Sequence, residues 1–165
     1  SQAAVSFEDQ LRSLLLVGPA SLGDIPRRGS MLPLIRRTPE MSEEQVHDTN
    51  RENLARLMFH DRSRIDDLAV VIQTIITRKA RFNSPQFART TLVLDGVGQI
   101  SIPVKVVYGE HDAPALPDVA SKQALFEARN PKVQFQIVPD AGHWLQYEKA
   151  DLFNELALRW LAASR

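Results

Sequence analysis

The sequence contains no cysteine in its 165 residues, which excludes disulfides, thiolate metal ligands and a cysteine nucleophile. It also carries no net charge, because 20 basic residues balance 20 acidic ones. This balance gives no electrostatic reason to expect nucleic acid or an anionic membrane as a partner. No apolar run approaches the roughly 20 residues that span a bilayer, and the first residues show no signal-peptide pattern. We therefore expect a cytoplasmic protein that binds neither nucleic acid nor membrane.

Three short runs rich in β-branched and apolar residues predict strands at Leu14–Val17, Val104–Tyr108 and Gln134–Val138. The first run is apolar at every position, which is typical of a strand buried on both faces of a parallel sheet. A helix predicted over Val119–Arg129 separates the last two strands, and another helix ends the chain. The apolar residues on one face of that terminal helix are Leu152, Phe153, Leu156, Ala157, Trp160 and Leu161. We therefore expect an α/β fold of parallel strands with flanking helices.

A helical insertion is predicted between the first two strands. Ser21–Pro39 is rich in glycine, proline and arginine and predicts a loop, whereas Ser42 and Gln45 form a capping box that predicts the start of a helix. A second helix carries a broad apolar face, which we expect to form the core of a lid or, in part, to line an apolar acyl or aryl pocket. The residues of this face are Ile65, Leu68, Ala69, Ile72, Ile75 and Ile76. Ser84–Ile102 predicts a loop or a short helix.

These elements divide the chain into three parts. Residues 1–22 hold a core strand, residues 23–90 form a helical cap or lid, and residues 91–165 complete the core. We call residues 23–90 the cap segment. A sheet of only three strands leaves the edge at Leu14–Val17 open, with unpaired backbone groups and uncovered side chains. We expect the chain by itself to be poorly stable or to pair with a partner.

An acid and a histidine follow the last two predicted strands. Asp112 lies four residues after Tyr108, and His143 lies five residues after Val138. Both are expected at the sheet edge where ligands bind in open α/β folds, because the carboxyl ends of parallel strands meet there. A carboxylate at this place accepts a hydrogen bond from Nδ1–H of the imidazole, holds its tautomer and leaves the other ring nitrogen to act as a general base. Two alternatives to this pairing remain. Asp112 and His143 are ordinary loop residues without a catalytic role, or Glu110 is the acid in place of Asp112.

These residues carry a family resemblance. The segments IPVKVVYGEHDA (102–113) and VPDAGHW (138–144), with the terminal amphipathic helix, resemble the last two strands and triad loops of α/β-hydrolases. SLLLVGPASLG (13–23) resembles the strand of that fold that leads into a helical cap, and the cap is most similar to those of meta-cleavage-product hydrolases and carboxylesterases. The resemblance implies that Asp112 and His143 are the acid and the base of a Ser–His–Asp triad. We expect no cofactor and no metal.

The nucleophile that the resemblance implies is not recognisable. No G-x-S-x-G occurs, and only thirteen residues precede the strand at Leu14, too few for a nucleophile elbow and its helix. Ser21 follows a strand, but Pro19 stands where the elbow needs a small residue, and no helix follows directly. We expect the serine and both oxyanion donors to come from a missing N-terminal half of the same enzyme. A domain-swapped homodimer is the other expected partner.

Several further residues have two interpretations each. Trp144 either walls the active site or packs on the core. Arg78, Lys79 and Arg81 either bind a substrate carboxylate or form a solvated helix end, where the helix dipole favours cations. His111 either lines the pocket beside Asp112 or, as we expect, points to solvent in the loop. His47 and His60 are expected at the surface or at helix ends.

We expect the complete protein to hydrolyse a small-molecule substrate, either an ester or a vinylogous diketone with a scissile C–C bond, held between cap and core. Epoxide hydrolases of this fold use cap tyrosines, and both tyrosines, Tyr108 and Tyr147, lie outside the cap segment. Haloalkane dehalogenases, with an aspartate nucleophile, remain open. The alternative from another class is a non-catalytic hydrolase-like module used for binding or self-association, which the missing nucleophile favours.

Overall fold

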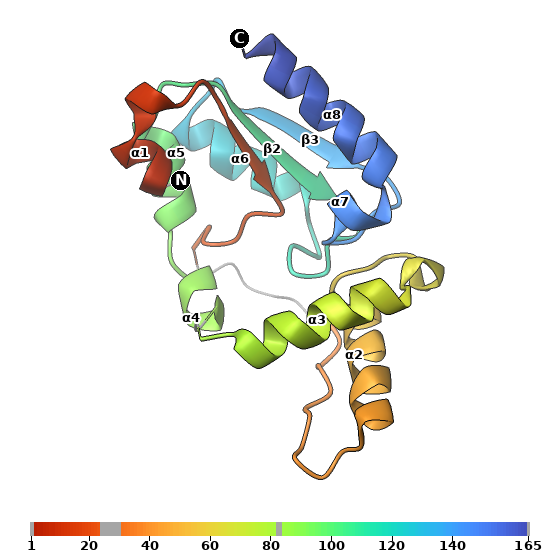
Figure 1. Cartoon of the computed structure of the whole chain (residues 1–165). Helices are drawn as coiled ribbons and strands as arrows, with labels where there is room; N and C mark the ends of the chain where they lie inside the picture. Colours follow the sequence, from red (N-terminus) through yellow and green to blue (C-terminus); the bar gives the residue numbers. More distant parts are fainter. Residues whose placement is uncertain (1, 24–30, 82–83, 165) are drawn as a thin grey trace.

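A computed structural model of the chain describes residues 2–23, 31–81 and 84–164 (Figure 1). Three parallel strands form one sheet in the order β1 (Leu14–Val17), β2 (Val104–Gly109) and β3 (Gln134–Val138). Leu14 lies opposite Val104 in the first pair. The predicted strands and the α/β fold class are confirmed, and β2 extends one residue further than predicted.

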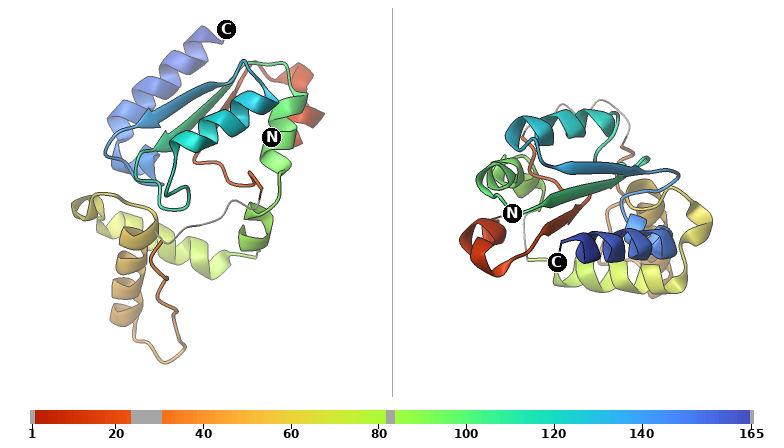
Figure 2. Two further views of the ribbon diagram at one scale, coloured as in Figure 1. Left: turned by 180° about the vertical axis from the view of Figure 1, so that it is seen from behind. Right: turned by 90° about the horizontal axis from the view of Figure 1, so that it is seen from above.

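Helices cover both faces of the sheet, with α6 and α8 on opposite sides (Figure 2). The core helices are α1 (Gln2–Ser6), α5 (Leu92–Gln99), α6 (Ala120–Arg129), α7 (Leu145–Glu148) and α8 (Ala150–Ala163), and a 3-10 turn, η1, covers Glu8–Gln10. The predicted helix between β2 and β3 and the terminal helix are thus confirmed. Within the described ranges, no helix is both long and apolar enough to cross a membrane.

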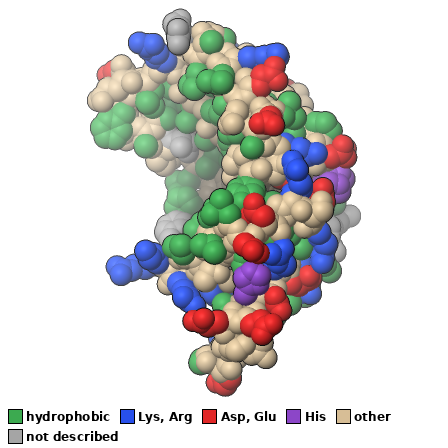
Figure 3. All heavy atoms as spheres, turned by 45° about the vertical axis from the view of Figure 1, so that its right-hand side comes forward, with side chains coloured by type: hydrophobic (Ala, Val, Ile, Leu, Met, Phe, Trp, Pro, Cys, Tyr) green, Lys and Arg blue, Asp and Glu red, His purple; other side chains and the backbone are tan. Residues whose placement is uncertain are grey.

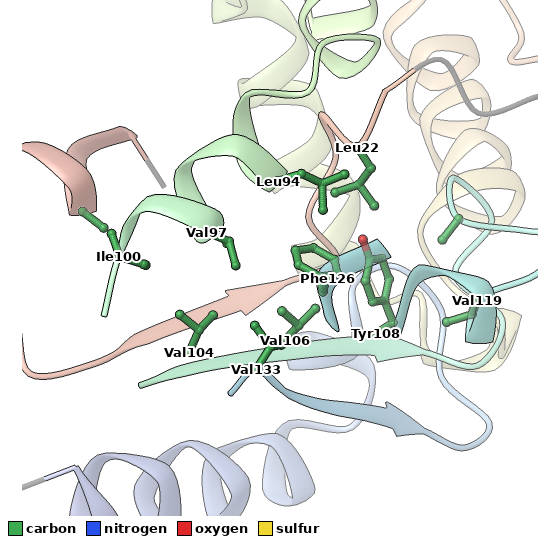
Figure 4. Close-up of a cluster of buried hydrophobic side chains, with 12 residues drawn as sticks. Leu22, Leu94, Val97, Ile100, Val104, Val106, Tyr108, Val119, Phe126 and Val133 are labelled. Atoms are coloured by element: carbon green, nitrogen blue, oxygen red, sulfur yellow. The ribbon is translucent and has the colours of Figure 1, made fainter. Parts of the chain in front are cut away.

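Alternation along the strands sends side chains into two cores. Val104, Val106 and Tyr108 of β2 point to the side of α5 and α6, where Phe126 fills the centre of a buried cluster (Figure 4). Val107, between them in sequence, belongs to the cluster on the other face, with residues of α7 and α8. Because successive side chains of a strand alternate between faces, one apolar strand serves both cores.

The expected burial is incomplete at two places. All four residues of β1 are only half-buried, because β2 is the one strand beside β1 among the described residues. The prediction of a strand buried on both faces is therefore wrong, whereas the expected open edge is present. In α8, Leu156 and Trp160 are buried but Leu152 and Leu161 are exposed, since a three-stranded sheet is too narrow to cover the whole predicted face.

The cap segment contributes two long helices below the sheet in Figure 1. The helix α2 (Glu43–Leu57) begins with the predicted capping box, in which Gln45 N–H donates to Ser42 Oγ (3.2 Å) and Ser42 N–H to Gln45 Oε1 (2.8 Å). A 3-10 turn, η2 (Arg62–Arg64), leads to α3 (Asp67–Lys79), and the short α4 (Ser84–Ala88) leads back to the core. Of the predicted loop Ser21–Pro39, residues 24–30 lie outside the described residues.

The apolar face of the second cap helix is only partly a core. Ile65, which was predicted in this helix but precedes α3, and Ala69 are buried against α2. Leu68, Ile75 and Ile76 are 59%, 49% and 54% exposed. The prediction that this face forms the core of the lid is therefore wrong for these three residues. The reason is that α2 packs against α3 from one side only. Figure 3 shows hydrophobic side chains beside the hollow between the core and the cap segment.

Candidate active site

Asp112 and His143 meet at the carboxyl edge of the sheet. Asp112 follows β2 and His143 follows β3, and because these strands are neighbours and parallel, the two loops lie side by side. The Nδ1 atom of His143 lies 2.8 Å from Oδ2 of Asp112. The Asp112 side chain is fully buried and that of His143 is 26% exposed. The pairing that the strand spacing predicts is present in the structure.

Backbone hydrogen bonds fix both loops. The N–H of His111 donates to Ala141 O (2.9 Å) and that of Glu110 donates to Val138 O (2.9 Å), so the acid loop is joined to the histidine loop. The N–H of Ala115 donates to the second carboxylate oxygen of Asp112 at 3.2 Å. With its carboxylate held from both sides, Asp112 is oriented to accept a hydrogen bond from Nδ1–H and so to fix the tautomer of the imidazole.

Gly18, at the end of β1, lies against this pair. Its φ is +50°, and a Cβ there would lie 3.0 Å from His143 Nδ1 and 3.1 Å from Asp112 Oδ2. Only glycine combines this left-handed backbone with so close an approach. The sequence shows Gly18 as the residue that closes a strand, but not its contact with the pair, which needs three strands packed side by side.

Ser21 is occupied elsewhere. Its side chain is buried, and its hydroxyl donates to Phe87 O at 2.9 Å. Its backbone N–H donates to Ala88 O (3.2 Å) and its carbonyl accepts from Val93 N–H (3.2 Å), so it ties the entrance of the cap segment to its exit. This engagement argues against Ser21 as the nucleophile. Within the described part of the chain, Nε2 of His143 makes no hydrogen bond.

The alternative acid, Glu110, faces away from the pair. Its carboxylate lies 3.7 Å from His111 Nε2 and accepts from Asp140 N–H at 3.2 Å, and its side chain is half-exposed. His111 does not point freely to solvent as predicted, because its ring stacks on that of His60, with centroids 3.7 Å apart and planes 11° apart.

His60, His111 and Asp140 each offer a metal-ligand atom, all within 4.8 Å of one another. The lone pairs of imidazole nitrogens lie in the ring plane, and the two rings are nearly parallel, so their nitrogens do not converge on one ion. The arrangement therefore fits a stacked pair at a loop junction better than a metal centre.

Trp144 packs on the cap segment. Its ring lies 5.8 Å from that of Phe59 and 6.2 Å from that of Tyr147, and its backbone N–H donates to Met58 O at 2.8 Å. Burial and the hydrogen bond that Tyr147 donates to Asp66 (2.6 Å) raise the pKa of Tyr147 to about 12. Trp144 thus packs against the cap segment and helps to hold it in place. Its role in the substrate pocket stays a prediction. The two arginines predicted for that pocket, Arg78 and Arg81, lie exposed at and just after the end of α3.

Glu148 is a functional candidate that the sequence analysis missed. It ends α7, and its carboxylate is buried with 1% exposure. It accepts from Gly142 N–H (2.7 Å) and from two backbone N–H groups of the cap segment, those of His60 (3.3 Å) and Asp61 (2.6 Å). A glutamate five residues after the histidine was the only signal in the sequence, and nothing local to it indicates partners in the cap segment.

Two hollows in the described structure lie away from the pair. One, of about 220 Å³, is formed within the cap segment around Arg51, Glu52 and Ile65. The other, of about 290 Å³, lies between the sheet and α8 beside Trp160. Neither includes Asp112 or His143.

Sequence comparison finds relatives that are named as hydrolases. No protein-family model matches the sequence. The chain is 27% identical to a 2-hydroxy-6-oxononadienedioate/2-hydroxy-6-oxononatrienedioate hydrolase from Klebsiella pneumoniae and 25% identical to a 2-hydroxy-6-oxo-6-phenylhexa-2,4-dienoate hydrolase from Burkholderia cepacia. These alignments cover 96% of this chain but only 56% and 57% of the two relatives. The chain thus spans a little more than half the length of the curated relatives that it matches.

Solved structures show the same relation. A meta-cleavage product hydrolase from Pseudomonas fluorescens, 15% identical, superposes on 99% of this chain and 60% of its own with a TM-score of 0.66. A serine hydrolase from Cycloclasticus zankles, 14% identical, covers 98% of this chain and 59% of its own with a TM-score of 0.64. At these identities the likeness shows the fold that the chain shares with both structures.

Proposed function

The chain is the C-terminal part of an α/β-hydrolase fold, and we propose that it supplies the acid and the base of a serine hydrolase triad. The hydrogen bond of 2.8 Å between the buried carboxylate of Asp112 and Nδ1 of His143 carries this proposal. The serine would come from a part of the fold that lies before β1 in the order of the chain. The described residues leave Nε2 of His143 available to it.

The chemistry follows from the two nitrogens of His143. Nε2 removes the proton of the serine hydroxyl as this oxygen attacks the substrate carbonyl, and the imidazolium then donates that proton to the leaving group. Asp112 accepts a hydrogen bond from Nδ1–H and stabilises the positive charge of the imidazolium. A water molecule, activated by the same nitrogen, then releases the acyl group and regenerates the serine.

The names of the relatives support a carbonyl substrate with a scissile C–C bond, and an ester is the other candidate. The exposed apolar residues of α3, including Leu68 and Ile75, support a site that takes an apolar chain or ring between cap and core. Arg78 and Arg81 would bind a substrate carboxylate, and Trp144 would form part of the wall.

The partner that we propose is the N-terminal part of the same enzyme, which would pair with the open edge of β1. Leu14 and Leu16 are half-buried and pack on the core on one face, so an added parallel strand would complete their burial. A domain-swapped homodimer would cover the same edge, and size-exclusion chromatography of the chain alone distinguishes a dimer from a monomer.

The test uses the chain extended by the coding sequence that precedes Ser1. Hydrolysis is measured with p-nitrophenyl acetate and with a vinylogous diketone, and the ratio of rates separates ester from C–C cleavage. His143→Ala should lower kcat on the order of 10⁴-fold, as expected for loss of a triad base. His47→Ala, which changes a half-exposed histidine of the cap segment, is the matched control and should leave kcat unchanged.

Activity that survives His143→Ala would contradict the triad. No hydrolysis by the extended protein, together with a stable dimer of the chain, would favour the non-catalytic module instead.

A further inference from the structure

The buried carboxylate of Glu148 joins two parts of the molecule that are distant in sequence. Its Oε2 accepts from Gly142 N–H at 2.7 Å and from His60 N–H at 3.3 Å, and its Oε1 accepts from Asp61 N–H at 2.6 Å. Gly142 directly precedes His143, whereas the other two donors lie in the turn between α2 and η2. One side chain therefore holds both the histidine loop and the cap segment.

The same two segments are also in direct contact. A Cβ on Gly142 would lie 2.6 Å from Met58 O and 2.7 Å from His60 N, so the cap turn lies directly against this glycine. Beside it, Trp144 N–H donates to Met58 O at 2.8 Å. His143 is thus flanked on both sides by residues that the cap turn fixes.

Charge explains why a carboxylate is present. Hydrogen bonds to an ionised acceptor are shorter and stronger than those between neutral groups, and a buried carboxylate needs several donors to offset its lost hydration. The carboxylate of Glu148 accepts hydrogen bonds from three backbone N–H groups, and each of these groups finds its acceptor in this carboxylate. A side chain with a single acceptor oxygen cannot serve all three.

We infer that Glu148 is a positioning residue that couples the position of the cap segment to the orientation of His143. This inference rests on the proposed function, since it concerns the geometry of the proposed base. Displacement of the Gly142 amide moves the imidazole relative to Asp112 and to the serine, and a misplacement of about 1 Å at a catalytic group costs on the order of 10²-fold in rate.

The test compares Glu148→Gln with Tyr147→Phe. Glu148→Gln keeps the size but leaves one acceptor oxygen for three donors. Tyr147→Phe is the matched control, because it removes a different link between α7 and the cap segment, the bond to Asp66, without touching the histidine loop. Proton NMR of the 165-residue chain follows the Nδ1–H signal of His143, and circular dichroism follows folding.

The expected result is loss of the Nδ1–H signal in Glu148→Gln, with folded circular dichroism, and its retention in Tyr147→Phe. In the extended enzyme, kcat should fall about 10- to 100-fold with Glu148→Gln while KM changes little. A Glu148→Gln chain that only melts earlier and keeps the signal would overturn the inference and leave Glu148 a structural residue.

Amide hydrogen exchange in the unmodified chain covers the case of a variant that does not fold. The amides of His60, Asp61 and Gly142 should exchange slowly and at similar rates, whereas exchange as fast as in exposed loops would contradict the shared anchor. Because the NMR signal and the exchange rates do not depend on hydrolysis, an inactive extended enzyme would count against the proposed function and not against this inference.

Discussion

Replacing Gly18 with alanine tests whether the end of β1 shapes the proposed dyad. The new methyl group would lie 3.0 Å from His143 Nδ1 and Cε1 and 3.1 Å from Asp112 Oδ2. Ordinary contacts of a Cβ begin near 3.4 Å, so the imidazole must move by a few tenths of an ångström or β1 must shift. A shift of β1 would break the hydrogen bond of 2.8 Å from Gly18 N–H to Val107 O, so we expect the imidazole to move instead and its hydrogen bond of 2.8 Å to Asp112 to lengthen.

The cost has two parts. A left-handed φ of +50° costs an L-residue about 1–2 kcal/mol relative to glycine. The displaced ring adds roughly a further 1 kcal/mol, the usual size of a lost buried hydrogen bond. We therefore expect Gly18→Ala to lower the free energy of unfolding by about 2–3 kcal/mol.

Gly98→Ala is the matched control, because it makes the same chemical change in a helix. Gly98 lies in α5 with an ordinary φ, and its Cβ would meet Arg129 O at 3.5 Å, an ordinary contact. Alanine is favoured over glycine in helices by about 1 kcal/mol, so this variant should be more stable than the unmodified chain. Two alanine substitutions should therefore shift stability in opposite directions.

Urea unfolding followed by circular dichroism measures both free energies, and the Nδ1–H proton signal of His143 reports the dyad. Gly18→Ala should weaken or remove that signal, and Gly98→Ala should keep it. Equal stability of the two variants, with the signal intact in both, would refute the close packing of Gly18 on the dyad.

Three further variants test the packing. Leu54→Ala opens a cavity in the fully buried centre of the cap cluster and should cost about 2–5 kcal/mol, measured by urea unfolding. Lys122 is buried, and burial lowers its pKa below the usual value for lysine, so in the alkaline range the unfolded state binds more protons than the folded state. Stability should therefore rise as the pH increases toward the usual pKa of lysine, and Lys122→Met should remove this rise in a pH series of urea midpoints. The hydrogen bond from Tyr147 holds the pKa of Asp66 below its usual value. This bond therefore stabilises the folded state at pH values above the usual pKa of aspartate, and the stabilisation is lost as the pH falls through the lowered pKa. Tyr147→Phe should therefore flatten the acid side of a pH series of urea midpoints.

The dyad was predictable because its placement depends on local rules. An apolar run in the sequence indicates a buried parallel strand. The residues a few positions after such a strand lie at the carboxyl edge of the sheet, independently of the rest of the fold. Asp112 and His143 follow neighbouring strands, so their meeting needed only the correct strand order. The capping box at Ser42 was predictable for the same reason, since donor and acceptor are three residues apart.

Glu148 was not predictable, because its donors include backbone groups up to 88 residues away that carry no side-chain signal. The exposed apolar residues of α3 were misassigned for a related reason. Periodicity identifies which residues share a helix face, but not whether another element covers that face, and here α2 covers only the opposite side.

The sequence by itself determined the strands, the main helices and the two residues that the loops bring to one edge, because periods of 2 and 3.6 are properties of the backbone geometry. Only the tertiary structure decided which apolar faces are covered, why Gly18 has no side chain and how Glu148 ties the cap segment to His143. These contacts join segments far apart in the chain, and they arise when packed elements bring backbone groups together.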